Sequence, residues 1–137
     1  LGAGGVVPSI IYSLLSMGCK KIFLSNRTIE KAENIKKKFE EVEVLKWKEI
    51  PDFDIVINAT SVGLKGESLD LDFNTKDKVF YDVIYNPKET QFLKKAKENG
   101  NRVENGKFMF IYQANQSFSI WNNVIPKIDD EVLKILG

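Results

Sequence analysis

The first residues that could do chemistry form a glycine-rich turn. The run Gly2-Ala3-Gly4-Gly5-Val6 stands directly before an apolar segment of helical pattern. Glycine tolerates the tight turn between a strand and a helix, and its missing side chain lets a pyrophosphate reach the backbone amides at the helix N-terminus. Val7 stands where the dinucleotide-binding fingerprint has its third glycine. The turn predicts a phosphate-binding loop, with a plain structural turn as the alternative.

A second candidate site follows at the end of the next predicted strand. Asn26, Arg27 and Thr28 stand about 20 residues after the glycines, where NAD-binding domains carry an acidic residue for the ribose hydroxyl. No carboxylate stands at this point; the guanidinium of Arg27 can bind a phosphate, and its two neighbours offer hydrogen bonds beside it. The sequence therefore favours NADP over NAD. The alternative is that Thr28 only caps a helix and Arg27 is an ordinary surface residue.

Strands and helices that could position these residues alternate along the chain. We predict strands over 21–25, 42–45, 54–58, 79–83 and 102–104, and helices over 6–16, 29–39 and 87–98. Asn86 and Pro87 are the expected N-cap and first residue of the third helix. The apolar run 55–57 predicts a strand covered on both faces. This alternation is typical of right-handed crossovers and a parallel sheet.

The pattern after Gly106 is helical. Phe110, Ala114 and Phe118 recur every fourth residue and Trp121 follows, so we predict a stripe that lies on the sheet. A last helix is predicted over residues 129–136.

Composition narrows the possible functions. The chain has 137 residues, of which 43% are hydrophobic and 28% charged, as expected for one soluble domain. Its net charge of +1 offers no electrostatic footprint for nucleic acid or an anionic membrane. With no histidine, and Cys19 as the one cysteine, it lacks the residues of the usual zinc sites and of serine-histidine triads. We expect a protein without a metal site in a reducing cytoplasm.

Four further segments complete the pattern. They are Asn58-Ala59-Thr60-Ser61-Val62-Gly63, the run 82–90, Asn105-Gly106, and a helix that carries Met109, Gln113, Ala114, Phe118 and Trp121. With the glycine loop and the turn at 26–28, this ordered set closely resembles the NADP-binding domain of the shikimate dehydrogenase family. The resemblance implies an α/β fold, a Rossmann-like doubly wound parallel sheet with C-terminal helices. Since only Leu1 precedes the glycine loop, we expect the first strand to be largely absent from the chain.

The resemblance also implies a role for each segment. For the phosphates, it implies a pyrophosphate held by Gly2, Ala3, Gly4, Gly5 and Val6, and an adenosine 2′-phosphate held by Asn26, Arg27 and Thr28. It implies a cofactor cleft lined by Asn58, Ala59, Thr60 and Ser61, with the nicotinamide near Val83, Gly106 and Met109. The substrate would be bound by Tyr85 and Gln113. Met109 and Gln113 are four residues apart and share a helix face. A buried amide at position 113 would find its partner in a polyhydroxy substrate.

The implied activity is reversible reduction of 3-dehydroshikimate to shikimate by NADPH, in chorismate and aromatic amino acid biosynthesis. In the family, a lysine and an aspartate handle the hydroxyl proton, and both belong to an N-terminal substrate-binding domain that nothing here matches. We therefore expect residues 1–137 to form the NADP-binding domain, without catalytic residues and inactive alone. A quinate/shikimate dehydrogenase and a non-catalytic dinucleotide-binding regulatory module stay open as alternatives, as does a homodimer.

Overall fold

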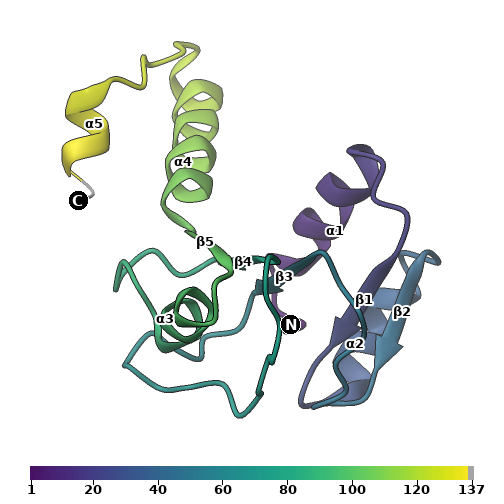
Figure 1. Cartoon of the computed structure of the whole chain (residues 1–137). Coiled ribbons are helices and arrows are strands. Elements are labelled where there is room, and N and C mark those ends of the chain that lie inside the picture. Colours follow the sequence, from purple (N-terminus) through teal and green to yellow (C-terminus); the bar gives the residue numbers. More distant parts are fainter. Residues whose placement is uncertain (136–137) are drawn as a thin grey trace.

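The computed structural model describes residues 1–135 as an alternation of parallel strands and helices (Figure 1). The strands are β1 (Ile22–Ser25), β2 (Val42–Leu45), β3 (Ile55–Asn58), β4 (Val79–Asp82) and β5 (Arg102–Asn105). The helices are α1 (Val7–Ser16), α2 (Ile29–Lys36), α3 (Gln91–Glu98), α4 (Lys107–Asn122) and α5 (Asp130–Ile135). Each predicted strand is present to within one residue at each end. The Leu136 end of the predicted last helix lies outside the described residues.

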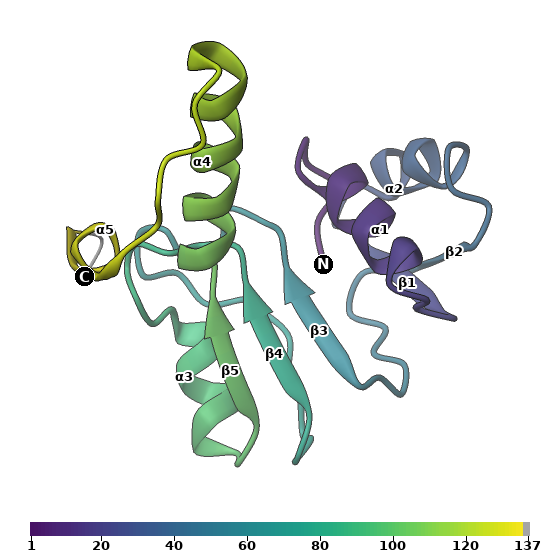
Figure 2. The same ribbon diagram turned by 90° about the horizontal axis from the view of Figure 1, so that it is seen from above.

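The strands form two parallel groups. β1 pairs with β2, and β3, β4 and β5 pair in that order, with Asn58 opposite Asp82 and Asp82 opposite Asn105. All three of these polar residues end their strands, so the register brings the carboxyl ends of β3, β4 and β5 to one edge (Figure 2). The predicted parallel α/β architecture is confirmed.

The first two residues connect the two groups of strands. The Leu1 amine donates to the Ile57 carbonyl at 2.7 Å, and the Ala59 amide donates to the Leu1 carbonyl at 2.8 Å, which is the pairing of a parallel strand. The Gly2 amide donates to the Ser25 carbonyl at 2.8 Å. The carboxyl ends of β1 and β3 are therefore held on either side of the glycine loop, as Figure 2 shows near the N-terminus.

An apolar cavity of about 380 Å³ opens beside Leu1, between β1 and β3. Ile22, Leu24, Ile55 and Ile57 are among its lining residues. Ile55 is 41% exposed, so the prediction that this strand is covered on both faces is wrong at that residue. The reason is that, within residues 1–135, β3 pairs along its length with β4, while on its other side Leu1 bonds to Ile57 and the cavity lies beside the rest of the strand.

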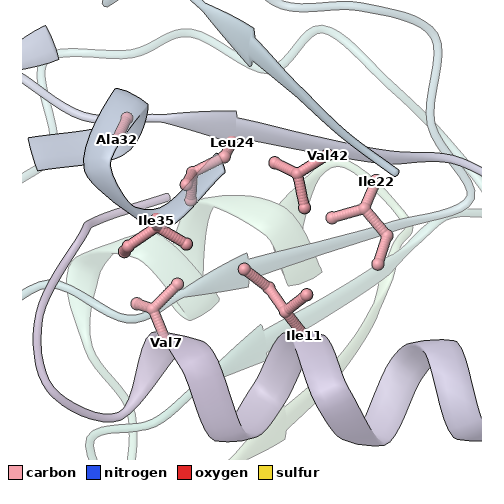
Figure 3. Close-up of a cluster of buried hydrophobic side chains, with 7 residues drawn as sticks. All are labelled: Val7, Ile11, Ile22, Leu24, Ala32, Ile35 and Val42. Atoms are coloured by element: carbon pink, nitrogen blue, oxygen red, sulfur yellow. The ribbon is translucent and has the colours of Figure 1, made fainter. Parts of the chain in front are cut away.

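Two apolar clusters form the core. The first joins α1 and α2 to β1 and β2 and is drawn in Figure 3; its buried members are Val7, Ile11, Ile22, Leu24, Ala32, Ile35 and Val42. The second lies between the three-stranded sheet and α3, where the rings of Phe73, Phe80 and Phe92 pack against one another. Each group of strands thus has its own core: one packs against β1 and β2, and the other against β3, β4 and β5.

Two predicted helix boundaries are wrong. α3 begins at Gln91 rather than at residue 87, and its N-cap is Thr90, whose hydroxyl accepts a hydrogen bond from the Leu93 amide. A side-chain oxygen at the N-cap satisfies one of the free amides of the first turn, which explains the later start. α2 ends at Lys36, three residues before the predicted end.

α4 does not lie on the sheet, so the predicted apolar stripe is wrong. The helix continues beyond the carboxyl end of β5, and α5 lies beside it (Figures 1 and 2). Ile111 is its buried residue, whereas Phe118 is 47% and Trp121 is 80% exposed. Apolar side chains such as Tyr112 stand on other faces of the helix too, so the sequence pattern selects no single buried face. Among residues 1–135, no helix combines the length and apolar character that crossing a membrane requires.

Candidate functional site

The glycine loop shows backbone geometry suited to an anion. Gly2 has a φ of +100°, and a Cβ on it would meet the Ala59 carbonyl oxygen at 2.8 Å, so a side chain there is strained and crowded. No heavy atom lies within 4 Å of the place a Cβ would occupy on Gly5. Within the described part of the chain, no hydrogen bond uses the amides of Gly4, Gly5 or Val6. These free amides at the start of α1 fit a phosphate group.

The turn after β1 presents free polar groups next to that loop. The Asn26 side-chain amide donates to the Thr28 carbonyl at 2.7 Å, which braces the turn. Thr28 is the N-cap of α2 by its backbone, but its hydroxyl makes no capping hydrogen bond. Arg27 is exposed, and no ion pair or hydrogen bond engages its guanidinium among residues 1–135. The bond from Gly2 to Ser25 places this turn beside the glycine loop, as the NADP hypothesis requires.

The side chains of Asn58 and Thr60, which were expected to line the cofactor cleft, instead hold the loop after β3 through internal hydrogen bonds. Asn58 is fully buried; its amide donates to the Val62 carbonyl at 3.2 Å and to the Asp82 carboxylate at 3.1 Å. Its side-chain carbonyl accepts from the amide of Thr60 at 3.1 Å and from the hydroxyl of Thr60 at 2.7 Å. Both side chains therefore shape the loop internally, while the exposed Ser61 and the half-buried Ala59 stand at its surface.

Asp82, which the sequence analysis did not select, lies at the centre of this arrangement. The residue is fully buried and accepts hydrogen bonds from the Thr90 hydroxyl at 2.6 Å, the Ile84 amide at 3.0 Å and the Asn58 amide. Burial raises the pKa of Asp82, and the hydrogen bonds from Thr90, Ile84 and Asn58 oppose that rise. The signal that could have found it is an acidic residue at the end of an otherwise apolar strand.

At the carboxyl ends of β4 and β5, two backbone segments pack closely against each other. A Cβ on Gly106 would overlap the Val83 carbonyl oxygen, and the Gly106 amide donates to the Ile84 carbonyl at 3.2 Å. The Tyr85 ring stacks on Phe110 of α4, with centroids 4.6 Å apart and planes at 24°. The segment after β4 is therefore fixed against the start of α4.

The two candidate residues on α4 differ from the expectation. Met109 is half-buried in the first turn of the helix. Gln113 is exposed, one turn further along, and its side-chain amide has no hydrogen-bond partner within residues 1–135. The premise of a buried amide at position 113 is wrong, because α4 leaves the sheet. The structure thus brings together the glycine loop, the turn at 26–28 and the segments after β3, β4 and β5, and leaves Gln113 free.

An open parallel sheet with a glycine loop at its carboxyl edge defines a dinucleotide-binding domain of the Rossmann type. The comparisons give the family. The family model described as shikimate / quinate 5-dehydrogenase matches residues 1–65. The shikimate dehydrogenase (NADP(+)) of Pelagibacter ubique (strain HTCC1062) is 54% identical over 139 residues, which cover 99% of this chain and 52% of that protein. The chain belongs to the shikimate dehydrogenase family and spans about half the length of the curated relatives it matches.

Solved structures agree with this assignment. Shikimate 5-dehydrogenase from Listeria monocytogenes, in complex with shikimate and NAD, has a TM-score of 0.85 at 29% identity, over 99% of this chain and 54% of that one. The ligand-free 5-ketofructose reductase of Gluconobacter sp. strain CHM43 also has a TM-score of 0.85, at 32% identity over 98% of this chain and 53% of that one. Similar folds thus serve different substrates, so the site's own residues must indicate the function.

Proposed function

We propose that this chain is the NADP-binding domain of a shikimate dehydrogenase. The observation that carries the proposal is a pair of free donor sets on neighbouring segments: the unpaired amides of the glycine loop and the unpaired guanidinium of Arg27. The family to which the chain belongs and the name of the Pelagibacter relative support the same reading. The proposed reaction is the reversible reduction of 3-dehydroshikimate to shikimate.

The cofactor's phosphates would be held at the β1 side of the edge. The amides of Gly4, Gly5 and Val6 would donate to the pyrophosphate, where the partial positive charge of the α1 N-terminus adds to the attraction. The guanidinium of Arg27 would bind the adenosine 2′-phosphate through paired hydrogen bonds, and the free Thr28 hydroxyl would donate beside it. These groups supply binding energy and the choice of NADP over NAD.

The nicotinamide would lie at the β4 and β5 side. Val83 and Gly106 present backbone there, and Met109 stands in the first turn of α4. Tyr85 and Gln113 would contact the substrate. When bound, the nicotinamide supplies the hydride, and the protein orients the two reactants. We propose no catalytic side chain in this chain; the proton on the substrate hydroxyl would be handled by the lysine and aspartate of a substrate-binding domain.

Residues 1–137 would therefore be one of two domains in a longer protein. Three observations support this. The chain spans about half the length of its relatives. An apolar cavity lies between β1 and β3 next to Leu1, and large apolar residues of α4 are exposed. A strand that precedes Leu1 would fill the cavity. We propose a cytoplasmic enzyme, and the exposed face of α4 would serve the second domain or a second copy of the chain.

The cofactor proposal is tested by titrating the chain with NADP, NAD and adenosine 2′,5′-bisphosphate in a calorimeter. We expect NADP to bind at least about tenfold more tightly than NAD, because a bidentate phosphate contact contributes about 1.5 to 3 kcal/mol. The bisphosphate should bind too, since it carries the group that Arg27 contacts. Equal affinities for NADP and NAD would contradict the proposal, and the NAD complex of the Listeria protein makes this a real alternative.

Two other functions need separate assays. A quinate/shikimate dehydrogenase is consistent with the description of the family model. Comparing kcat/KM for shikimate and quinate in the protein extended upstream of Leu1 decides between the substrates. If the extended protein binds NADP but oxidises neither substrate, the chain belongs to a regulatory dinucleotide-binding module instead.

A further inference from the structure

We propose that Asp82 is a positioning residue for the nicotinamide end of the cofactor cleft. Its carboxylate accepts hydrogen bonds from Asn58 at the end of β3, from the Ile84 amide after β4 and from Thr90 at the start of α3. Within residues 1–135, no hydrogen bond joins it to the glycine loop or to the turn at 26–28. The inference rests on the proposed function, since it assigns to one residue the alignment of the same cofactor. It adds that Asp82 aligns the nicotinamide end of the cofactor, whereas the adenosine end is aligned by other residues.

The first set of contacts leads from Asp82 to the backbone of the segment after β4. Oδ1 accepts from the Ile84 amide at 3.0 Å. The carbonyl of Ile84 in turn accepts from the Gly106 amide at 3.2 Å. Gly106 is packed so closely against the Val83 carbonyl that no side chain fits between them. One carboxylate oxygen therefore fixes the peptide groups that flank the proposed nicotinamide position.

The second set leads to the segment after β3. Oδ1 of Asp82 also accepts from the Asn58 side-chain amide at 3.1 Å. This bond fixes the orientation of Asn58, whose side-chain carbonyl then accepts from both the amide and the hydroxyl of Thr60. The Thr60 hydroxyl accepts from the Val62 amide at 3.1 Å. Loss of the carboxylate would leave a buried Asn58 N–H unpaired, with the Val62 carbonyl as the remaining acceptor of that amide, and would weaken the hold of Asn58 on the loop.

The remaining oxygen is tied to a helix. The Thr90 hydroxyl donates to Oδ2 at 2.6 Å and accepts from the Leu93 amide, so α3 is anchored to the end of β4. All three residues of this contact are buried. Buried polar networks that are fully satisfied are rigid, because every alternative arrangement leaves a donor or acceptor unpaired. The network thus holds the cleft in one arrangement before any ligand arrives.

The glycine loop and the turn at 26–28 are held by different bonds. The Gly2 amide bonds Ser25, and Asn26 braces Thr28. The glycine loop meets the network at the segment after β3, where the Ala59 amide donates to the Leu1 carbonyl and Gly2 packs against Ala59 and Thr60. Perturbing Asp82 should therefore weaken contacts to the nicotinamide half of NADP and spare those to the 2′-phosphate.

The test is a pair of titrations on three forms of the chain: unmodified, Asp82→Ala and Asp82→Asn. Each is titrated with NADP and with adenosine 2′,5′-bisphosphate, which lacks the nicotinamide half. In Asp82→Ala we expect NADP affinity to fall about tenfold, because the buried carboxylate that accepts bonds from Asn58, Ile84 and Thr90 is lost, and bisphosphate affinity to stay within about twofold. Asp82→Asn keeps a carbonyl oxygen for Asn58 and Ile84 but removes the acceptor of the Thr90 hydroxyl, so its loss of NADP affinity should be smaller than that of Asp82→Ala, and its bisphosphate affinity should be unchanged.

The outcomes separate the inference from the proposed function. If the unmodified chain binds neither ligand, the proposed function fails. If it binds both, equal losses for the two ligands in Asp82→Ala, or no loss, overturn the positioning role. A loss in Asp82→Asn as large as in Asp82→Ala also overturns it. Should Asp82→Ala not fold, Thr90→Val replaces it, with Thr90→Ser as its matched control; a threefold or larger loss confined to NADP and to Thr90→Val is then expected.

Discussion

The two ends of the candidate cleft are built in opposite ways. At the β1 end, the polar groups that matter are free: the amides of the glycine loop, the Thr28 hydroxyl and the Arg27 guanidinium. At the β4 end, the buried side chains of Asn58 and Thr90 are already bonded to the buried carboxylate of Asp82. Free groups can bind a ligand directly, whereas bonded groups can only hold other atoms in place.

This difference separates recognition from alignment. A charged phosphate is recognised by donors that meet it directly, and exposed side chains on a braced turn serve that purpose. A hydride transfer depends instead on a fixed distance between two reactants, which a rigid buried network provides better than mobile surface groups. Substitutions at the β1 end should change which nucleotide binds, and substitutions at the β4 end should change stability and alignment.

The largest effect is expected at Gly106. A Cβ there would overlap the Val83 carbonyl oxygen, so Gly106→Ala must displace backbone. We expect the free energy of unfolding to fall by about 3 kcal/mol, the upper range for overpacking. Urea denaturation measures the change. The matched control is Gly5→Ala, where no heavy atom lies within 4 Å and the free energy should change by less than about 0.5 kcal/mol. If Gly106→Ala and Gly5→Ala lowered the free energy of unfolding equally, the β4 end would not be more tightly packed than the β1 end.

The next effect concerns Leu1, which joins the two ends. In the polypeptide of residues 1–137 taken alone, Leu1 carries a free amine, and burial lowers the pKa of that amine from 8.0 to about 6. The native state then binds this proton less tightly than the unfolded state does, so stability rises as pH increases from 6 to 8. At about 1.36 kcal/mol per pH unit, the difference in pKa is worth about 2.7 kcal/mol over the whole pH range, of which about 2 kcal/mol falls between pH 6 and pH 8. The chain has no histidine whose titration would overlap this range.

Denaturant titrations between pH 6 and pH 8 measure that rise. N-terminal acetylation provides the control, because the acetylated nitrogen keeps one N–H for the Ile57 carbonyl but carries no charge. The acetylated chain should show a flat profile over this range. A rise of equal size in both forms would mean that another group titrates, and that the Leu1 amine is solvated in the native state.

A smaller effect is expected at Arg27, and it should appear in binding alone. Arg27→Ala removes an exposed guanidinium that has no partner in the described chain, so stability should change by less than about 0.5 kcal/mol. NADP affinity should fall about tenfold while NAD affinity stays the same. Arg102→Ala is the control, since Arg102 is also exposed but begins β5 at the opposite edge. If both variants lose NADP affinity equally, the effect is one of overall charge.

Much of the β1 end could be predicted from the sequence, because its chemistry is local. The glycines, the Asn26-Arg27-Thr28 turn and the strand before it are read within a few residues of one another. β1 to β4 could be predicted to within a residue because each is a short, mainly apolar run between turn residues. The turn's proximity to the loop then follows from the rule that parallel strands end at one edge.

The β4 end could not be predicted in the same way, because its contacts are long-range. Asp82 meets Asn58 across 24 positions and Thr90 across eight, and no local pattern marks these pairs. The true N-cap of α3, Thr90, was missed for a different reason: Pro87 also satisfies the local rule for a helix start. Likewise, α4 has a period-four pattern, but tertiary packing decides which of its apolar faces is covered, and Ile111 alone is buried.

The smallest effect is expected at Gln113, which tests whether the β4 end extends onto α4. Its side chain is exposed and unpaired in the described residues, so Gln113→Ala should change the free energy of unfolding by less than about 0.5 kcal/mol and leave NADP affinity unchanged. If Gln113 binds substrate as proposed, the same substitution in the protein extended upstream of Leu1 raises the KM for shikimate and not the KM for NADP. Gln116→Ala, also exposed on α4, is the matched control. An unchanged KM for shikimate would restrict substrate contacts from this chain to the segment around Tyr85, where the ring is already held against Phe110.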